Sequence, residues 1–267
     1  MCILAILYQK AKNAPILVAG NREEAIDRPT QAPKIQSGTP RVVCGIDRRA
    51  GGTWFGINQH GLMATVSNAR KREVPLSPRS RGLLCRELLS CANAREATDM
   101  AESELASGAY DGAHYLVADS RYGAVVLGGD RVQRVDLIPG LHILSETGLD
   151  NFGDPRQEMV RRMLTLQTLD SSVTFLAVAS RTFSKTPDLS APRRGSDRGG
   201  SRVETVSSAL LSLSERIQNS VFQYAPGPPT DTPYDDLSAL LRQVLSTGKS
   251  KRRRAAEEDD DYWSLAD

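Results

Sequence analysis

The sequence has few of the features that indicate a metal, a membrane or a polyanionic partner. Its four cysteines, Cys2, Cys44, Cys85 and Cys91, lack zinc-type pair spacing, and its three histidines share no metal-ligand spacing. No apolar run approaches the ~20 residues of a membrane span, and P-loop and dinucleotide fingerprints are absent. Lys+Arg 34 against Asp+Glu 32 leaves a net charge of +2, so nothing global favours a polyanion. We therefore expect no metal, no cofactor and no membrane span.

The composition fits one folded domain followed by a charged tail. Of the 267 residues, 40% are hydrophobic and 25% charged, close to the globular average. We expect a domain over residues 1–247, with a mobile loop at about 184–202 that either contacts an anionic substrate group or is a solvated insertion. Residues 248–267 carry a basic run and then an acidic run, and are expected to be disordered. The acidic run would compete for the arginines, which disfavours nucleic-acid binding.

Cys2 is the most informative residue. Removal of Met1 would leave its thiol beside a free α-amino group, which titrates near ~7.7–8.0 and can act as a base near neutral pH. The thiolate is the nucleophilic form of cysteine, and the amine can accept its proton without a separate histidine. The alternative is that Cys2 packs as a small hydrophobe in a terminal strand. The opening run lacks a basic region and a cleavage site, so we expect a reduced, cytoplasmic protein.

A second apolar run, residues 14–19, leads into a polar segment that would lie near Cys2. The polar connection at 9–13 has hairpin length, which predicts two paired strands. A guanidinium beside a thiol lowers the thiol pKa, and a carboxylate can orient the amine or the arginine. Arg22 and Glu24 are the candidates for these roles. The alternative is a strand end with ordinary solvated charges.

The rest of the pattern indicates antiparallel sheets covered by helices, a layered α+β protein rather than alternating βαβ units. We expect strands at 42–46, 53–57, 62–66, 115–118, 124–127, 141–144, 203–211 and 220–224. We expect helices within 82–106, after 154–155 and over 234–245, while the pattern over 171–180 fits either a helix or a strand.

Several separated motifs resemble those of the NRDE family, also called transport and Golgi organisation protein 2. Their order and spacing span most of the chain, up to about Leu245. They lie at residues 1–3, 21–24, 28–30, 51–57, 61–68, 79–82, 110–112, 140–145 and 206–211.

The resemblance implies a four-layer αββα sandwich of the N-terminal nucleophile hydrolase type. Related amidases cleave amide bonds with an N-terminal cysteine, an arginine-asparagine-acid segment and asparagines that hold the oxyanion. By this comparison Cys2 is the nucleophile, Asn21 and Arg22 lie in the polar segment, and Asn68 holds the oxyanion.

Two residues depart from the family pattern. Glu23 replaces the aspartate of the name motif and lengthens that arm by one methylene. Glu146 follows Leu144 and Ser145 where the family usually has asparagine. An amide donates to a developing oxyanion, whereas an ionised carboxylate repels it. Asn21, Glu23 and Glu146 are therefore assigned to binding.

Two functions follow as hypotheses. The first is hydrolysis of a nonpeptide amide, with Cys2 as nucleophile, Arg22 stabilising the thiolate, Asn68 holding the oxyanion and Glu24 orienting the site. The second is noncatalytic, a carrier or chaperone for haem or acyl-lipid metabolites, which the Glu146 departure motivates. A protein-interaction scaffold has no support beyond the charged tail. The substrate or ligand is a small molecule that the sequence does not identify, and it does not fix the oligomeric state.

Overall fold

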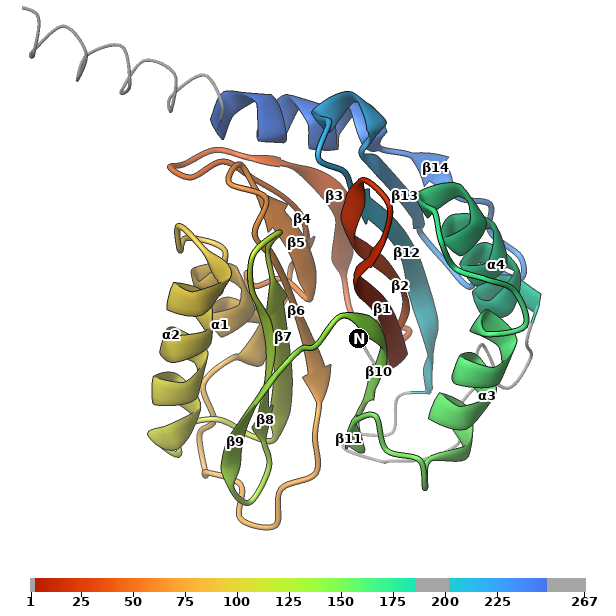
Figure 1. Cartoon of the computed structure of the whole chain (residues 1–267). Helices are drawn as coiled ribbons and strands as arrows, with labels where there is room; N and C mark the ends of the chain where they lie inside the picture. The colour runs from red at the N-terminus through yellow and green to blue at the C-terminus, as the bar shows by residue number, and fades with distance from the viewer. Residues whose placement is uncertain (1–2, 186–201, 249–267) are drawn as a thin grey trace, which may run out of the picture.

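The computed structural model describes residues 3–185 and 202–248 (Figure 1). Cys2 lies outside the described residues. So do nearly all of the loop predicted at 184–202 and of the tail predicted at 248–267.

The first sheet is built on the predicted N-terminal hairpin. β1 (Ile3–Ala11) pairs antiparallel with β2 (Ala14–Ala25), and the connection at 9–13 turns with positive φ at Gln9 and Asn13. The strand order is β11-β10-β1-β2-β12-β13-β14. The further strands are β10 (Gly140–Ser145), β11 (Gly148–Leu149), β12 (Val203–Leu213), β13 (Val221–Ala225) and β14 (Asp235–Asp236).

The second sheet is a meander in which each strand pairs with the next along the chain, from β3 to β9. Short connections join most neighbours and favour antiparallel pairing, whereas β6 and β7 are joined by the longer segment that forms the two helices between residues 69 and 112. Its strands are β3 (Thr30–Gln36), β4 (Val42–Asp47), β5 (Phe55–Asn58), β6 (Met63–Asn68), β7 (Ala113–Ala118), β8 (Gly123–Gly128) and β9 (Val132–Asp136).

Helices cover the outer faces of the two stacked sheets, which confirms the predicted αββα sandwich (Figure 1). α1 (Arg81–Leu88) and α2 (Ala94–Ala106) pack on the second sheet. α3 (Pro155–Leu164) and α4 (Ser172–Lys185) pack on the first. None of the helices in the described ranges is both long and apolar enough to cross a bilayer. The same ranges hold no cluster of His, Cys, Asp and Glu suited to a metal ion.

Strand alternation decides which side chains face the other sheet. Leu4 and Ile6 of β1 belong to the core between the sheets, whereas Ala5 and Leu7 pack toward α3 and α4. In β2, Val18 lies in the core between the sheets. Positions 22 and 24, which share the parity of Val18, therefore face the space between the sheets, and positions 21 and 23 face the helices.

The sequence offered no signal for the short strand β11, and it missed or misplaced three further elements. The helix predicted over 234–245 begins at 238 and continues to 248, because Asp235 and Asp236 form a short strand against β13. β3 and β9 were not predicted. Each is a largely solvent-facing edge strand with too few apolar residues for an alternating pattern.

Candidate active site

The first described residue, Ile3, lies between two other strands of its sheet. It pairs with Asn21 of β2 on one side and with Ser145 of β10 on the other. The segment 21–24 and the residue after Ser145, Glu146, therefore lie at the same sheet end as the start of β1. Cys2, the predicted nucleophile, directly precedes Ile3 in the sequence.

A pocket of about 280 Å³ opens at this end, between β2, β6 and the start of α1. Four of the predicted site residues line it: Arg22, Glu23, Glu24 and Asn68. Six of the nine motifs contribute to it, and together they supply all of its sixteen lining residues except Asp47, Ala50 and Pro78. The motif residues in the lining are Arg22, Glu23, Glu24, Arg28, Thr53, Trp54, Val66, Asn68, Arg79, Ser80, Arg81, Gly82 and Asp111.

Alternating charges run along one wall of the pocket. Arg22 Nη2 lies 3.5 Å from Glu24 Oε2, and Arg28 Nε lies 3.9 Å from the same oxygen. Arg28 Nη2 then donates to Asp47 Oδ2 at 2.5 Å. Although burial favours the neutral carboxyl, the hydrogen bond from Arg28 holds the pKa of Asp47 below its usual value. Each charged side chain thus has an opposite charge beside it. The ion pairs hold the side chains of this wall in place, and each group keeps its charge.

Arg22 is held from the opposite sheet as well. Its guanidinium carbon lies over the Trp54 ring, 4.2 Å from the ring centroid, and only 4% of the residue is exposed. Burial lowers the pKa of the Arg22 guanidinium, and Glu24 opposes that shift. Arginine remains charged under such conditions because its usual pKa is above ~12. The pocket therefore keeps a fixed cation next to Asn21, which faces Ile3.

The second wall is the beginning of α1 and the loop before β7. Ser80 caps the helix by accepting from Leu83 N, and Arg81 follows as the first helical residue. Arg81 Nη1 donates to Gly112 O at 3.0 Å and lies 3.8 Å from Asp111 Oδ2. These contacts hold a second cation in the pocket lining.

Two glycines bring α1 into contact with the turn between β4 and β5. A Cβ on Gly52 would lie 2.1 Å from the carbonyl carbon of Gly82, so no larger residue fits there. Thr53 N donates to Gly82 O at 2.8 Å across this contact. The close approach fixes the start of α1 at the edge of the pocket.

The remaining predicted residues are distributed around the pocket. Asn68 ends β6 and is an exposed residue of the lining. Glu23 turns away from the other sheet and forms an ion pair with Arg156 of α3. Asn21 is fully buried opposite Ile3. Glu146, like Asn21, lies at this sheet end but does not line the pocket.

The segment around Glu146 is tied to both sheets. Burial lowers the pKa of the His114 imidazole to about 4, against the effect of a hydrogen bond to the main chain of Glu146. His114 of β7 is thus neutral at pH 7 and joins the second sheet to the end of β10. The sequence offered no signal for this role, since isolated histidines in strands are usually structural.

Ser145 is held by buried polar groups at the start of α3. Ser145 Oγ donates to Asp154 Oδ2 at 2.8 Å and accepts from Gln157 Nε2 at 2.8 Å. Thr147 Oγ1 donates to the same Asp154 oxygen at 2.7 Å. Asp154 also caps α3 by accepting from Arg156 N. This cluster positions the end of β10 beside Ile3.

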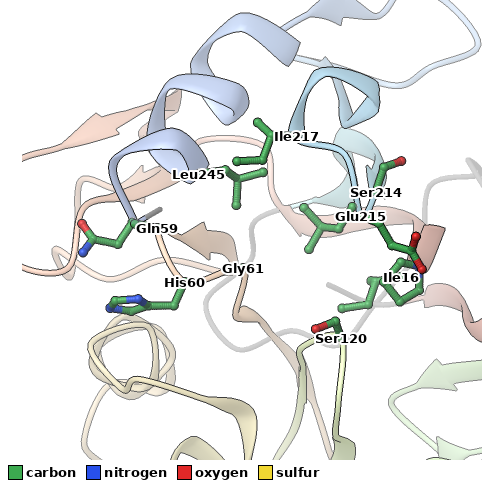
Figure 2. A pocket seen from close by; sticks show the side chains of 12 residues that line it. Ile16, Gln59, His60, Gly61, Ser120, Ser214, Glu215, Ile217 and Leu245 are labelled. Carbon is green, nitrogen blue, oxygen red and sulfur yellow. The ribbon is translucent and has the colours of Figure 1, made fainter. Parts of the chain in front are cut away.

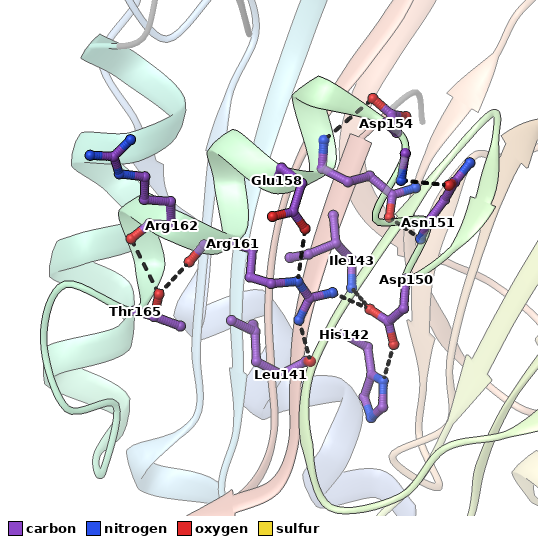
Figure 3. Close-up of polar contacts among 12 residues, drawn as sticks. Leu141, His142, Ile143, Asp150, Asn151, Asp154, Glu158, Arg161, Arg162 and Thr165 are labelled. Atoms are coloured by element: carbon purple, nitrogen blue, oxygen red, sulfur yellow. Dashed lines mark hydrogen bonds and ion pairs between the residues drawn. The ribbon is translucent and has the colours of Figure 1, made fainter.

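A second polar cluster, centred on Asp150, holds β10 at His142 and Ile143 (Figure 3). Asp150 Oδ2 lies 2.7 Å from His142 Nδ1, and Asp150 Oδ1 accepts from Arg161 Nη2 at 2.5 Å and from Ile143 N at 2.9 Å. His142 Nε2 lies 2.8 Å from Ile138 O. Both ring nitrogens face acceptors, the arrangement of a doubly protonated ring.

A second pocket, of about 350 Å³, lies at the opposite end of the two sheets (Figure 2). It is formed where β2 and β12 have their other ends, at Ile16 and Leu213, and beside the turn between β5 and β6. Ile217 and Leu245 complete an apolar wall. None of the seven predicted site residues lines it.

Sequence reasoning missed Asp47 entirely and gave no role to Arg28, Arg81 or Asp111, although the last three lie within quoted motifs. The signal was the clustering of charged residues in those motifs. Their convergence needs the fold, because Arg28 and Asp111 are far apart in the sequence.

Solved structures with a similar fold include two amide-cleaving enzymes. Penicillin V acylase from Agrobacterium tumefaciens superposes with a TM-score of 0.51 and 13% identity, over 90% of this chain and 88% of that one. The Caenorhabditis elegans ortholog of N-acylethanolamine-hydrolyzing acid amidase gives a TM-score of 0.54 and 14% identity, over 91% and 98%. These similarities show an N-terminal nucleophile hydrolase-like fold.

Curated relatives match part of the chain. The Transport and Golgi organization protein 2 homolog of Bos taurus is 28% identical over 163 residues, and that of Homo sapiens is 25% identical over 162 residues. Each match covers 56% of this chain and 58% of the relative. The family model described as Transport and Golgi organisation 2 matches residues 1–186. The chain therefore belongs to the Transport and Golgi organisation 2 family.

Proposed function

We propose that this protein is an N-terminal-nucleophile-type hydrolase of a nonpeptide amide, with residues 1–247 as the catalytic unit. The observation that carries the proposal is the convergence of six separated motifs on one polar pocket, at the sheet end where β1 begins. Structural cores need apolar residues, whereas this lining holds eight charged side chains and an asparagine. Such a concentration of polar groups in a concave site is typical of a catalytic site.

The proposed nucleophile is Cys2, after removal of Met1. Its α-amine accepts the thiol proton, and the thiolate attacks the amide carbonyl carbon to form a C–S bond. The Asn68 amide and main-chain N–H groups hold the oxyanion, and the α-ammonium returns its proton to the departing amine. Water then hydrolyses the thioester to release the acid. The proposal requires the Cys2 thiol to reach the face of β1 on which Leu4 and Ile6 lie.

Arg22 and Glu24 act through charge in this scheme. The fixed Arg22 guanidinium favours the thiolate, and Glu24 holds Arg22 in position. Glu146 lies outside the pocket lining, so the scheme gives it no part in the oxyanion site. Glu23 serves the site indirectly by anchoring α3 through Arg156.

The decisive experiment is intact-mass analysis before and after brief treatment with iodoacetamide, followed by peptide mapping. Burial raises the pKa of the Cys44 and Cys91 thiols to about 11 and raises that of Cys85 further, so these thiols are inert in the folded protein at pH 7.5. We expect loss of Met1 and modification at Cys2 alone, with a rate that rises through a pKa below that of an ordinary thiol.

Matched variants separate catalysis from labelling. Cys2→Ala abolishes both labelling and amide turnover under this proposal, whereas Cys91→Ala changes neither. Retention of Met1, an unreactive Cys2, or full amide turnover by Cys2→Ala would each overturn the assignment.

The noncatalytic alternative, a carrier for haem or acyl lipid, is favoured by the second pocket. Its apolar wall of Pro15, Ile16, Leu213, Ile217 and Leu245 suits an apolar ligand (Figure 2). Haemin and palmitoyl-CoA are the probes. Saturable binding that Ile217→Asp weakens, with Cys2→Ala binding as well as the parent, would favour the carrier. Absence of saturable binding would exclude it for these ligands.

A further inference from the structure

We infer that the substrate is a small amide bearing a free carboxylate, and that Arg81 recognises this carboxylate. The inference rests on the proposed function, because it assigns a substrate class to the same pocket. The inference is drawn from the residues that line this chain's own pocket and not from the two structurally similar enzymes.

The size and charge of the pocket limit what can enter. A volume of about 280 Å³ falls below the range of about 300–1,000 Å³ typical of drug-sized ligands, so the bound group is small. The lining carries four arginines and four carboxylates: Arg22, Arg28, Arg79, Arg81, Glu23, Glu24, Asp47 and Asp111. An apolar acyl chain placed here would remove water from these charged groups without forming hydrogen bonds to replace those of the water. A polar, charged group replaces the lost water with hydrogen bonds.

Two of the four arginines are already committed to the protein. Arg22 has a side chain only 5% exposed and is stacked on Trp54. Arg28 is bound to Asp47 at 2.5 Å. A ligand carboxylate would have to displace these partners, and the free energy lost with the existing contacts would exceed the free energy gained from the new ones.

Arg79 and Arg81 differ from each other in how strongly other groups of the protein engage their guanidinium groups. Arg79 forms an ion pair with Glu104 and lies over the Tyr110 ring, 5.1 Å from its centroid. Within the described ranges, the Arg81 guanidinium donates a hydrogen bond through Nη1 to Gly112 O, and its 3.8 Å separation from Asp111 Oδ2 exceeds hydrogen-bond length. With its side chain 31% exposed, Arg81 presents donors toward the pocket.

Guanidinium geometry explains why a carboxylate is the matching group. The planar fork of arginine donates two parallel N–H groups, which fit the two oxygens of a carboxylate. Main-chain attachment of Nη1 to Gly112 restricts the fork and reduces the entropy lost on binding. The guanidinium group of Arg81 is thus oriented to bind a planar carboxylate at the pocket wall.

The test uses a matched set of amides: succinamic acid, its neutral analogue succinamide, apolar butyramide and decanoyl ethanolamide. Hydrolysis consumes one water and releases ammonia, or ethanolamine, together with the acid. We expect kcat/KM for succinamic acid to exceed that for succinamide and butyramide by about tenfold or more, the value of one charge-assisted contact. Preference for decanoyl ethanolamide would overturn the substrate class and leave the proposed hydrolase intact.

Arg81→Gln should raise KM for succinamic acid about tenfold while kcat changes little, and Arg81→Lys should restore part of the loss. Arg86→Gln is the matched control. Arg86 lies on the same helix and also donates Nη1 to a main-chain oxygen, Gly51 O at 3.0 Å, but does not line the pocket. An equal effect of both variants would contradict recognition by Arg81.

A binding measurement separates failure of this inference from failure of the hydrolase. Calorimetric titration of Cys2→Ala with succinamic acid and succinamide needs no turnover. Saturable binding of the acid that Arg81→Gln weakens would support the inference even if no amide is cleaved. Equal binding of acid and neutral amide, or none of either, would overturn it.

Discussion

The Arg22 guanidinium carbon lies over the indole ring of Trp54, 4.2 Å from the ring centroid, and joins the two sheets at the candidate site. The pair connects β2 of one sheet to the residue before β5 of the other. Stacking orients the guanidinium plane, while Glu24 attracts its positive charge from 3.5 Å. The cation is therefore fixed by Trp54 of the other sheet as well as by its own strand.

Arg22→Lys should lower the free energy of unfolding by about 1 kcal/mol, because lysine keeps the charge but lacks the planar group that stacks on Trp54. Arg22→Met should cost more, since it leaves Glu24 without its nearest cation. Urea unfolding monitored by circular dichroism measures both. Arg72→Met, at a surface ion pair with Asp130, is the control. Equal effects at positions 22 and 72 would contradict a buried role for Arg22.

Asp154→Ala should destabilise the protein by about 2–4 kcal/mol, because Asp154 accepts from two hydroxyls and from the main chain of α3. Burial favours the neutral carboxyl, but hydrogen bonds from Thr147 and Ser145 lower the pKa of Asp154 below its usual value. A depressed pKa contributes stability above the unfolded value of ~3.9, and this contribution is lost as pH falls through the folded pKa.

Urea unfolding of the parent and of Asp154→Asn at pH values from 7 to 3 measures that contribution. The parent should lose stability more steeply than Asp154→Asn below pH ~4. Asp231→Asn, at an exposed position, is the control and should follow the parent. Parallel curves for the parent and Asp154→Asn would exclude linkage through this carboxyl.

His142 should make stability depend on pH in the opposite sense. Burial lowers the pKa of its imidazole, but Asp150 and the Ile138 carbonyl outweigh burial and raise the pKa above its usual value. The contribution is complete below the unfolded pKa of ~6.5 and is lost as pH rises through the folded pKa. His142→Gln should remove this loss in urea midpoints measured from pH 5.5 to 8.5. His60→Gln should retain it, and a flat parent profile would contradict the prediction.

Gly52→Ala and Gly82→Ala should differ in sign or size although the two glycines touch. An added Cβ on Gly52 would lie 2.1 Å from main-chain carbon, so we expect a loss of about 3 kcal/mol or more. On Gly82 the nearest atom, Thr53 O, is 3.2 Å away, and alanine gains about 1 kcal/mol of helix propensity, so the change should be near neutral. Thermal unfolding compares the two variants, and equal losses would refute the packing argument.

The sequence predicted the central elements well because their signals are local. The β1–β2 hairpin joins two apolar runs whose consecutive residues are buried, and α3 begins with Asp154 and Pro155, a cap followed by a residue suited to the first turn. The last helix was begun four residues early because Asp235 and Asp236 join a strand edge, which is a tertiary effect. The polar edge strand β3 gave no periodic signal at all.

The site was only partly predictable for the same reason. The segment 21–24 could be related to Ile3, since one hairpin connects them. Asp47 and Arg81 reach the pocket through the second sheet and α1, and no sequence pattern links them to β2. The resemblance supplied Asn68, which the structure places in the pocket lining, and its oxyanion role stays a prediction. The placement of Glu146 away from the lining required the coordinates.

The pairing of Ile3 with strands on both sides has a consequence for production of the protein. The chain ahead of Ile3 begins at the sheet end where the polar pocket opens. Gly248, by contrast, lies against the main chain of Gln59 at the opposite end of the sheets. An affinity tag belongs after residue 248, where its linker leaves the fold on the far side from the chemistry. A tag at the other terminus would confound every activity assay.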